Sequence, residues 1–442
     1  MEPLLSLGPE GMSAALSGKR VLIAQPFLHA FGGSELIALE LAEALRSVGC
    51  SVDVVSWSVS DAWRERFRDV ADAEVFEHDT DSFAARLVSA PPHLVWSHQG
   101  FIPERLVREP GSTRFVFAHL SSFHPYESPF SPELELSLAD HIYIVSPEAA
   151  EELVDDGPLR GADPERVSIL RNPAPEEFHA WPGSGLREAD AELGNLLVVS
   201  NHFPEEVKQA IAELRDRGVL VKAVGVNQPG VDSAPERITA ELLSQFDAVL
   251  SIGKTVQYAL AMGIPVYCYD HFGGPGWIGQ QTQRLAESKN YSGRGFDAKT
   301  SESIAEELVQ GFSEAAAFTT STRGEWRLRY SYAGVLQQLA KVLAAPTPDR
   351  QPVPLPVVRG YIDAHRAVQE FGRAYHQLNF LTAQHISNLE DIISAQSEEV
   401  ESLKASRASQ QKSGSHRICL RVVSRVRRAL ARLSARWFSG GA

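Results

Sequence analysis

The stretch that decides the fold lies at residues 247–278 and reads DAVLSIGKTVQYALAMGIPVYCYDHFGGPGWI. An apolar run ends before Gly253, a helical pattern follows, and a second apolar run ends in Asp270 and a Gly-Gly-Pro-Gly loop. This succession predicts a strand, a helix and a second strand, with a polar loop after each strand. Ligands of open α/β sheets bind just beyond the carboxyl ends of the strands. The residues at these ends that suit phosphates or hydroxyls are Gly253, Lys254, Thr255, Asp270, Gly273 and Gly274.

Gly253, Lys254 and Thr255 resemble the end of a phosphate-binding P-loop, whose pattern is Gly-x-x-x-x-Gly-Lys-Ser/Thr. The first glycine of that pattern would fall at Ala248, inside an apolar run that has the character of a strand. An ATPase is therefore not predicted. Backbone N–H groups at the start of a helix, together with Lys254, still favour an anionic ligand at this point.

Composition narrows the class of protein. The 442 residues are 43% hydrophobic and 22% charged, which fits a globular protein of two to three domains. The formal net charge of −14 argues against nucleic acid as a partner. The cysteines lie far apart and no histidine or aspartate spacing indicates a metal, so we expect neither a disulfide framework nor a metal site. Because no secretory signal and no apolar stretch of ~20 residues occurs, we expect a cytoplasmic protein.

Strand and helix signals alternate along two successive regions. After a segment at 1–18 that we expect to be flexible, the first region covers residues 19–185 and the second covers residues 186–345. Such alternation predicts parallel sheets covered by helices. We therefore expect an α/β fold with two Rossmann-like domains that face each other across a cleft. One large doubly wound sheet is the alternative.

Beyond the second region the pattern becomes helical. Residues 346–356 form a proline-rich linker, and residues 357–412 carry apolar residues at heptad spacing, among them Ile386, Leu389 and Ile393. This pattern predicts a helical extension with a short coiled coil, through which the chain would form a homo-oligomer. Because the pattern lasts only about two to three heptads, a helix that docks on the chain's own domains is the alternative.

The last segment, residues 413–442, is strongly basic, with seven arginines and no acidic residue. A stripe of apolar residues runs beside the arginines and ends at Trp437 and Phe438, which predicts a basic amphipathic helix. We expect Arg417 to Trp437 to bind an anionic membrane surface, which would place the protein at the inner face of the plasma membrane. A helix that binds a partner protein, or one that contacts nucleic acid, are the alternatives.

Four short motifs occur in order within residues 19–345: GGSE at 32–35, FAH at 117–119, ILRNP at 169–173 and AMGIPV at 261–266. In order and spacing they resemble GT-B-fold glycosyltransferases, especially the large retaining family that uses nucleotide sugars to build capsules, O-antigens and glycolipids. The resemblance implies two Rossmann-like domains, the first for the acceptor and the second for the donor. It also implies no cofactor besides the nucleoside-diphosphate sugar, and an acceptor that is a carbohydrate or is linked to lipid.

The chain departs from the pattern of that family at two points. The loop after the first strand of the second domain lacks the family's lysine or arginine and offers Asn201 and His202 instead. The positions of the family's two glutamates hold Leu250 and Tyr258, which cannot do the work of a carboxylate. The resemblance implies a retaining, metal-independent transferase, but without these glutamates retention of configuration does not follow from the resemblance alone.

Glycosyl transfer from a nucleotide sugar builds negative charge on the departing diphosphate, so the site needs cations or N–H groups aimed at it. Lys254 is expected to stabilise that charge, and Arg294, which lies between two glycines, to contact a phosphate or the acceptor. His119 is expected to bond the transferred sugar or to deprotonate the acceptor hydroxyl. The other expected contacts are Gly32, Gly33, Asn201, His202, Gly253, Thr255, Asp270, Gly273 and Gly274 for the donor, and His124 and Glu127 for the acceptor. Each has an ordinary alternative as a solvated lysine, a structural histidine, a cap or a loop glycine.

The sequence therefore predicts a glycosyltransferase that moves a sugar from a nucleoside-diphosphate sugar to a carbohydrate or lipid-linked acceptor, in the synthesis of surface polysaccharide or cell-envelope glycan. The main rival is a non-catalytic GT-B-like scaffold that binds a sugar nucleotide or glycan, which the missing glutamates support. A sugar-nucleotide epimerase of the same architecture is a third hypothesis, and it would need no second substrate.

Overall fold

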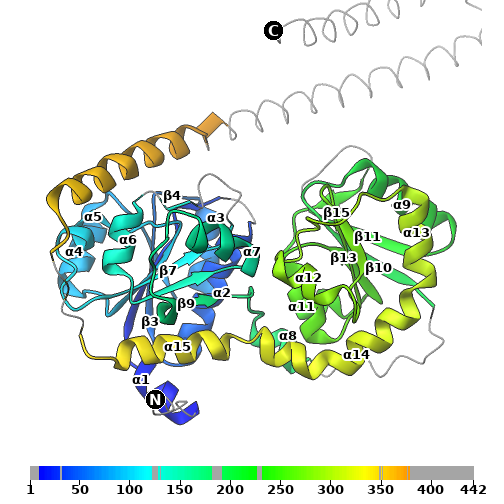
Figure 1. The fold of residues 1–442 in the computed structure, drawn as a ribbon, viewed down its shortest axis with the longest axis horizontal. Coiled ribbons are helices and arrows are strands. Elements are labelled where there is room, and N and C mark those ends of the chain that lie inside the picture. Colours follow the sequence, from blue (N-terminus) through cyan, green and yellow to red (C-terminus); the bar gives the residue numbers. More distant parts are fainter. Residues whose placement is uncertain are drawn as a thin grey trace, which may run out of the picture. The chain divides into compact units, whose positions relative to one another are not determined.

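The structure is a computed structural model that describes residues 9–29, 32–121, 128–129, 131–181, 192–225, 231–347, 350, 352–375 and 377–378. Up to Gly372 the chain forms one compact unit, and this unit contains two α/β domains (Figure 1). The predicted pair of Rossmann-like domains is confirmed. Among the described residues, no helix is both long enough and apolar enough to span a membrane.

The first domain is built on a seven-stranded sheet whose neighbouring strands are all parallel. The strands in spatial order are β5 (Glu74–Glu77), β3 (Ser51–Ser56), β1 (Arg20–Ala24), β6 (Leu94–His98), β7 (Arg114–His119), β8 (His141–Ile144) and β9 (Val167–Ile169). From β1 the chain adds strands first toward β5 and then, beyond β6, in the opposite direction. The direction of winding therefore reverses between β1 and β6. A separate two-stranded sheet pairs β2 (Phe27–Leu28) with β4 (Ser58–Val59).

Helices cover both faces of this sheet (Figure 1). They are α1 (Pro9–Leu16), α2 (Gly33–Ser47), α3 (Asp61–Ala71), α4 (Asp81–Ser89), α5 (Glu104–Arg108), α6 (Pro132–Leu138) and α7 (Pro147–Ala150), with single turns at Glu151–Asp155 and Pro164–Arg166. The alternation of side chains along β1 divides the core in two: Val21 and Ile23 face one cluster, and Leu22 and Ala24 face the other. Burying each of the larger side chains, Val21, Leu22 and Ile23, contributes roughly 1.5–3 kcal/mol.

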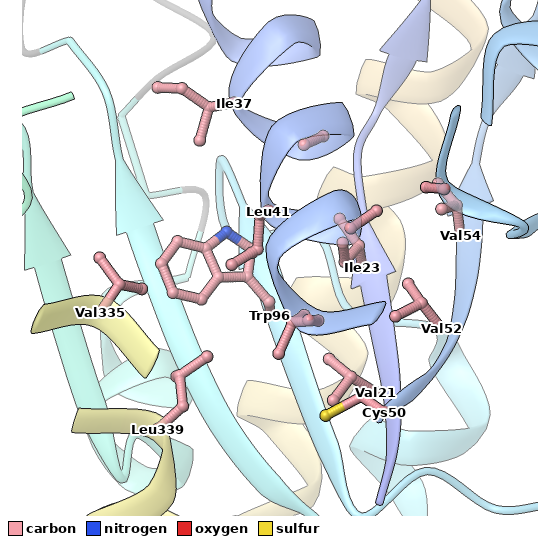
Figure 2. Packing of buried hydrophobic residues seen from close by; sticks show 14 of the residues in the cluster. Val21, Ile23, Ile37, Leu41, Cys50, Val52, Val54, Trp96, Val335 and Leu339 are labelled. Atoms are coloured by element: carbon pink, nitrogen blue, oxygen red, sulfur yellow. The ribbon is translucent and has the colours of Figure 1, made fainter. Parts of the chain in front are cut away.

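Helix α15 (Tyr332–Ala344) returns to the first domain although it follows the second domain in sequence. Val335 and Leu339 of α15 pack in one core cluster with Trp96 of the first sheet (Figure 2). The segment at 1–18 also contributes to this core, because Leu16 of α1 is buried and its carbonyl accepts a hydrogen bond from the Cys50 thiol. The boundary expected at residue 345 thus falls after a helix that belongs to the first core.

The second domain is built on a six-stranded sheet in the spatial order β12 (Ser233–Ala234), β11 (Leu220–Val224), β10 (Asn195–Val199), β13 (Ala248–Ser251), β14 (Val266–Asp270) and β15 (Gly273–Trp277). Its helices are α8 (Glu176–Ala180), α9 (Glu205–Asp216), α10 (Ala240–Leu243), α11 (Lys254–Met262), α12 (Gln283–Ser288), α13 (Ser301–Gln310) and α14 (Phe312–Arg329). The strand, helix and strand predicted in residues 247–278 are β13, α11 and β14. Here the winding reverses between β10 and β13.

The Gly-Gly-Pro-Gly segment was expected as a loop, and this expectation is wrong. It forms the edge strand β15, which pairs antiparallel with β14. A Cβ atom at Gly274 would lie 2.1 Å from the carbonyl oxygen of Cys268, so the close pairing depends on glycine. Pro275 lacks an N–H group, which an edge strand tolerates. The turn between the two strands consists of His271 and Phe272.

After the proline-rich linker, residues 355–375 are helical. Val358, Tyr361 and Ile362 of this helix are buried in the second core cluster of the first domain, so its first part docks on the chain's own domain. The Tyr361 hydroxyl donates to the carbonyl of Ile102 over 2.7 Å, and the indole N–H of Trp57 donates to Nε2 of His365. The heptad positions from Ile386 onward and the basic segment 413–442 lie outside the described residues.

Three buried histidines of this unit should make the protein sensitive to mild acid. Burial lowers the pKa of His98 and His365 to about 3 and that of His141 to about 4. Above about pH 6.5 these side chains are neutral in both states. Below it the unfolded chain binds protons that the folded chain excludes, so the free energy of unfolding falls by up to about 1.4 kcal/mol per pH unit for each histidine.

We therefore expect the urea midpoint of unfolding to fall as the pH is lowered from about 6.5 to about 5. His365→Phe should reduce that slope, because it removes one of the excluded protons. Because the other titrating groups are the same in the wild type and in His365→Phe, the difference between the two slopes reports the effect of His365 alone. A midpoint that stays constant over this range, or equal slopes in the two proteins, would contradict the assignment.

Candidate functional site

The carboxyl ends of the parallel strands mark where a ligand should bind, above all where the winding reverses. In the first domain this point lies beyond β1 and β6, at Gln25 and His98. In the second domain it lies beyond β10 and β13, where residues 200–203 and Gly253 follow the strands. Asn201, His202 and Gly253 were nominated from the sequence, whereas Gln25 and His98 were not.

Loops at the edge of the second domain are bonded to one another. Gly253, with φ 59°, is the N-cap of α11, and its N–H donates to the carbonyl of Tyr291 over 3.0 Å. Gly293, with φ 83°, approaches Gly273 so closely that a Cβ atom would lie 2.3 Å from its carbonyl oxygen. The glycines therefore bring the loops after β13 and β14 together with the 291–295 loop. Thr255 is half-buried in the first turn of α11.

His202, Asp270 and His271 meet at this edge, with ligand atoms that all lie within 4.8 Å of one another. The imidazole rings of His202 and His271 have centroids 4.5 Å apart. Asp270 is 1% exposed, whereas both histidines are exposed, as is Asn201. Two of the three residues were expected from the sequence, and His271 was not.

Arg294 lies in the 291–295 loop and pairs with Glu148, which lies in the first turn of α7 in the first domain. The distance from Arg294 Nη2 to Glu148 Oε2 is 2.6 Å, and Lys289 Nζ lies 2.8 Å from Glu148 Oε1. Burial raises the pKa of Glu148, but the hydrogen bonds and charges of Arg294 and Lys289 outweigh burial, so the net effect lowers it. Two cations of the second domain thus share one carboxylate of the first.

Lys254 is buried and pairs with a different glutamate of the first domain. Its Nζ lies 2.7 Å from Oε2 of Glu40, in the middle of α2, and donates to the carbonyl of Pro173 over 2.9 Å. The hydroxyls of Tyr258 and Tyr332 also donate to the Glu40 carboxylate. Burial lowers the pKa of Lys254 although Glu40 opposes that shift. A diphosphate could reach the ammonium group only if this arrangement opened.

The carboxyl edge of the first sheet holds two buried histidines. His119 ends β7, is 0% exposed, and its Nε2 lies 2.9 Å from Oε2 of Glu135 in α6. His98 ends β6, and its Nδ1 bonds to the side-chain oxygen of Gln25. Burial, with a smaller contribution from the charge of His119, lowers the pKa of His98 to about 3, so His98 stays neutral. Within the described ranges, Nε2 of His98 and Oε1 of Glu135 have no hydrogen-bond partner.

Because the Glu135 carboxylate contacts Nε2 of His119, it determines the chemical role of the other ring nitrogen, Nδ1. We assign the proton to Nε2, where it points at Glu135, which leaves Nδ1 as a proton acceptor. A carboxylate that orients an imidazole in this way is the usual arrangement for a general base. The pair also serves a simpler purpose, since it satisfies the hydrogen bonding of two buried polar groups.

The remaining nominated residues are placed as follows. Gly32 is the N-cap of α2 and Gly33 its first residue, so both lie at the positive end of a helix that starts at the carboxyl edge of the first sheet. Side-chain space differs between them: a Cβ at Gly32 would lie 2.3 Å from Oε2 of Glu35, whereas a Cβ at Gly33 would meet nothing within 4 Å. His124 and Glu127 lie outside the described residues.

Three nominated residues, Lys254, Arg294 and His119, each pair with a different glutamate of the first domain. No contact described in the structure joins the three to one another. Sequence reasoning missed these glutamates, Glu40, Glu148 and Glu135. A signal existed for Glu40, which interrupts the apolar face of α2 between Ile37 and Leu41, and for His98, which ends an apolar strand as His119 does.

No protein-family model and no curated protein matches the chain. Among solved structures, a glycosyltransferase from Rickettsia africae matches 74% of this chain and 98% of its own, with 12% identity and a TM-score of 0.50. HepE from Anabaena, in complex with UDP and glucose, matches 74% of this chain and 100% of its own, with 12% identity and a TM-score of 0.48. A candidate UDP-N-acetylglucosamine 2-epimerase from Listeria monocytogenes matches 76% and 100%, with 11% identity and a TM-score of 0.45. At such low identity the first of these shows the fold, which is of the GT-B type.

Proposed function

We propose that the protein is a glycosyltransferase that moves a sugar from a nucleoside-diphosphate sugar to a carbohydrate or lipid-linked acceptor. The observation that carries the proposal is the pairing of Arg294 and Lys289 with Glu148. It places two cations of the second domain beside the carboxyl edge of its sheet and next to the first domain. A donor diphosphate has the charge and the number of oxygens to replace Glu148 as the partner of these cations.

In the proposed reaction the bond between the anomeric carbon and the donor phosphate breaks, and a bond to an acceptor hydroxyl forms. The nucleoside diphosphate leaves with the bonding electrons, so negative charge grows on its outer phosphate. Arg294, Lys289 and the N–H groups that follow Gly253 stabilise this charge. His119 accepts the hydroxyl proton in an inverting reaction, or bonds the transferred sugar in a retaining one. The configuration of the product distinguishes these two roles.

Replacing Arg294 should weaken donor binding. Loss of a charge-assisted hydrogen bond typically costs about 1.5–3 kcal/mol, so we expect the dissociation constant for the nucleoside-diphosphate sugar to rise roughly 10- to 100-fold in Arg294→Ala. Isothermal titration calorimetry measures it directly. Arg284→Ala, which removes an exposed arginine of α12, is the matched control and should bind like the wild type. Equal affinity in Arg294→Ala and the wild type would remove Arg294 from the donor site.

The proposal as a whole is tested by the release of nucleoside diphosphate, with and without acceptor glycans. A transferase releases it faster when the acceptor is present. A sugar-nucleotide epimerase would instead convert the donor sugar without any acceptor. A donor that binds but never turns over would favour the non-catalytic scaffold, a candidate that the neutralisation of Lys254 by Glu40 also favours.

We further propose that the basic segment 413–442 holds the enzyme at an anionic membrane surface, where lipid-linked acceptors of surface polysaccharide or cell-envelope glycans lie. Support comes from the sequence, in which seven arginines accompany an apolar stripe. Co-sedimentation with vesicles of anionic lipid, compared between the full chain and a chain ending at residue 412, tests this part separately from catalysis.

A further inference from the structure

The cluster of His202, Asp270 and His271 has features that the proposed transfer reaction does not explain. Asp270 is 1% exposed, and its Oδ2 has no hydrogen-bond partner in the part of the chain that the structure describes. An unpaired buried carboxylate oxygen is costly, about 1–3 kcal/mol or more. A cation at this position would remove that cost. We infer that these three residues form a binding site for a divalent transition-metal ion of the zinc class.

Hydrogen bonds of the backbone order the two loops that carry these side chains before any ion binds. Ser200 Oγ accepts hydrogen bonds from the N–H groups of His202 and Phe203, at 3.0 and 3.1 Å, and Phe203 is buried beneath the loop. On the other strand, Oδ1 of Asp270 accepts from the N–H of His271 over 2.8 Å. Oδ1 is therefore used locally, and Oδ2 is the oxygen left for an ion. Such support of the ligands is what metal sites require.

The ligand types select the metal. Two imidazoles and one carboxylate suit zinc and its transition-metal neighbours, whereas calcium and magnesium prefer oxygen ligands only. Ligand atoms bound tetrahedrally to one zinc ion at about 2.0–2.2 Å lie about 3.5 Å apart. Since the donor atoms here lie within 4.8 Å of one another, binding needs a contraction of up to roughly 1.3 Å. Rotation of the two exposed imidazoles supplies it.

Three protein ligands leave at least one coordination position open, as in metal sites that bind a water molecule or a substrate oxygen. The cluster lies at the carboxyl edge of the second sheet, where the proposed donor phosphates would also lie. The inference does not depend on the transfer reaction, because the ion alone is the probe. The spacing of the ligands along the chain gives no metal signal, since His202 and His271 come from different loops.

The test uses the full-length protein after treatment with a chelator. Zinc is titrated by calorimetry, and cobalt, whose visible absorption reports imidazole ligation, is titrated in parallel. We expect one site per chain in the wild type, with affinity at least about 100-fold lower in Asp270→Asn and His271→Ala. His29→Ala, which removes an exposed histidine of the first domain, should bind as the wild type does.

His202→Ala and His271→Ala both alter exposed side chains, so each should fold normally. Circular dichroism checks that they fold. If Asp270→Asn disturbs the buried turn, these two histidine variants still test the site. The inference is overturned if both histidine variants bind zinc with the affinity of the wild type, because the ion then binds elsewhere. It is also overturned if the wild type binds zinc only as weakly as the variants do.

Discussion

Glu40→Ala is expected to destabilise the protein by about 3–5 kcal/mol, the typical cost of leaving a buried charge without its partner. Glu40 is 2% exposed and is the anion opposite Lys254, whose ammonium group lies 2.7 Å away. Without it, the lysine keeps the carbonyl of Pro173 as a described hydrogen-bond acceptor, and the hydroxyls of Tyr258 and Tyr332 lose theirs. Urea unfolding at neutral pH measures the change.

Two further variants make this prediction specific. Glu43→Ala alters the same helix one turn later, where the side chain is 27% exposed and pairs with Arg237, so we expect a loss of about 1 kcal/mol or less. Burial already raises the pKa of Glu43 to about 7, which weakens that pair at neutral pH. In Glu40→Ala with Lys254→Met, the loss should be smaller than the sum of the two single losses. Strict additivity would show that Glu40 and Lys254 do not interact.

His119→Asn is expected to lower kcat by about 100- to 10,000-fold if the histidine accepts the acceptor proton, as general bases typically contribute that much. Asparagine keeps a polar side chain of similar size but cannot take up a proton at neutral pH. Glu135 acts on the reaction through its contact with His119, so it is a positioning residue. Glu135→Gln should lower kcat less and should shift the pH dependence of kcat/KM, which a purely structural role would leave unchanged.

The matched control for this prediction is His141→Asn. His141 is also buried, but it begins β8 at the amino edge of the sheet, away from the site. The kcat of His141→Asn should stay within a few-fold of that of the wild type after correction for the fraction of folded protein. Equal losses in the two variants would mean that His119 serves the fold rather than the reaction.

Much of the fold could be predicted because the signals for it are local. The apolar runs that became β10, β13 and β14 are bounded by polar or glycine-rich segments, and the helices between them have one apolar face. Two features of the fold, the strand β15 and the docking of α15 on the first domain, were not predicted, and each has a physical reason. Glycine and proline usually mark loops, yet at β15 they permit an edge strand to pair closely with β14. The periodicity of α15 shows a helix but cannot show which domain's core it joins.

The candidate site could be predicted only in part. Strand ends can be read from sequence, so His119, His202, Asp270 and Lys254 could be nominated. Their partners could not, because Glu40, Glu135 and Glu148 come from distant segments and are brought near only by the tertiary fold. His271 was passed over for the same reason: its neighbour in space, His202, lies on another strand end.

The central claim, that the second domain binds a nucleoside-diphosphate sugar, is tested most directly by calorimetric titration of the wild-type protein with UDP-, GDP-, dTDP- and CMP-sugars. We predict saturable binding of one of the three nucleoside-diphosphate classes, with one molecule per chain, and none of the CMP-sugar, which carries a single phosphate. If well-folded protein binds none of the UDP-, GDP- and dTDP-sugars, the claim is contradicted, and with it the assignment of the carboxyl edge of β10, β13 and β14 as a donor site.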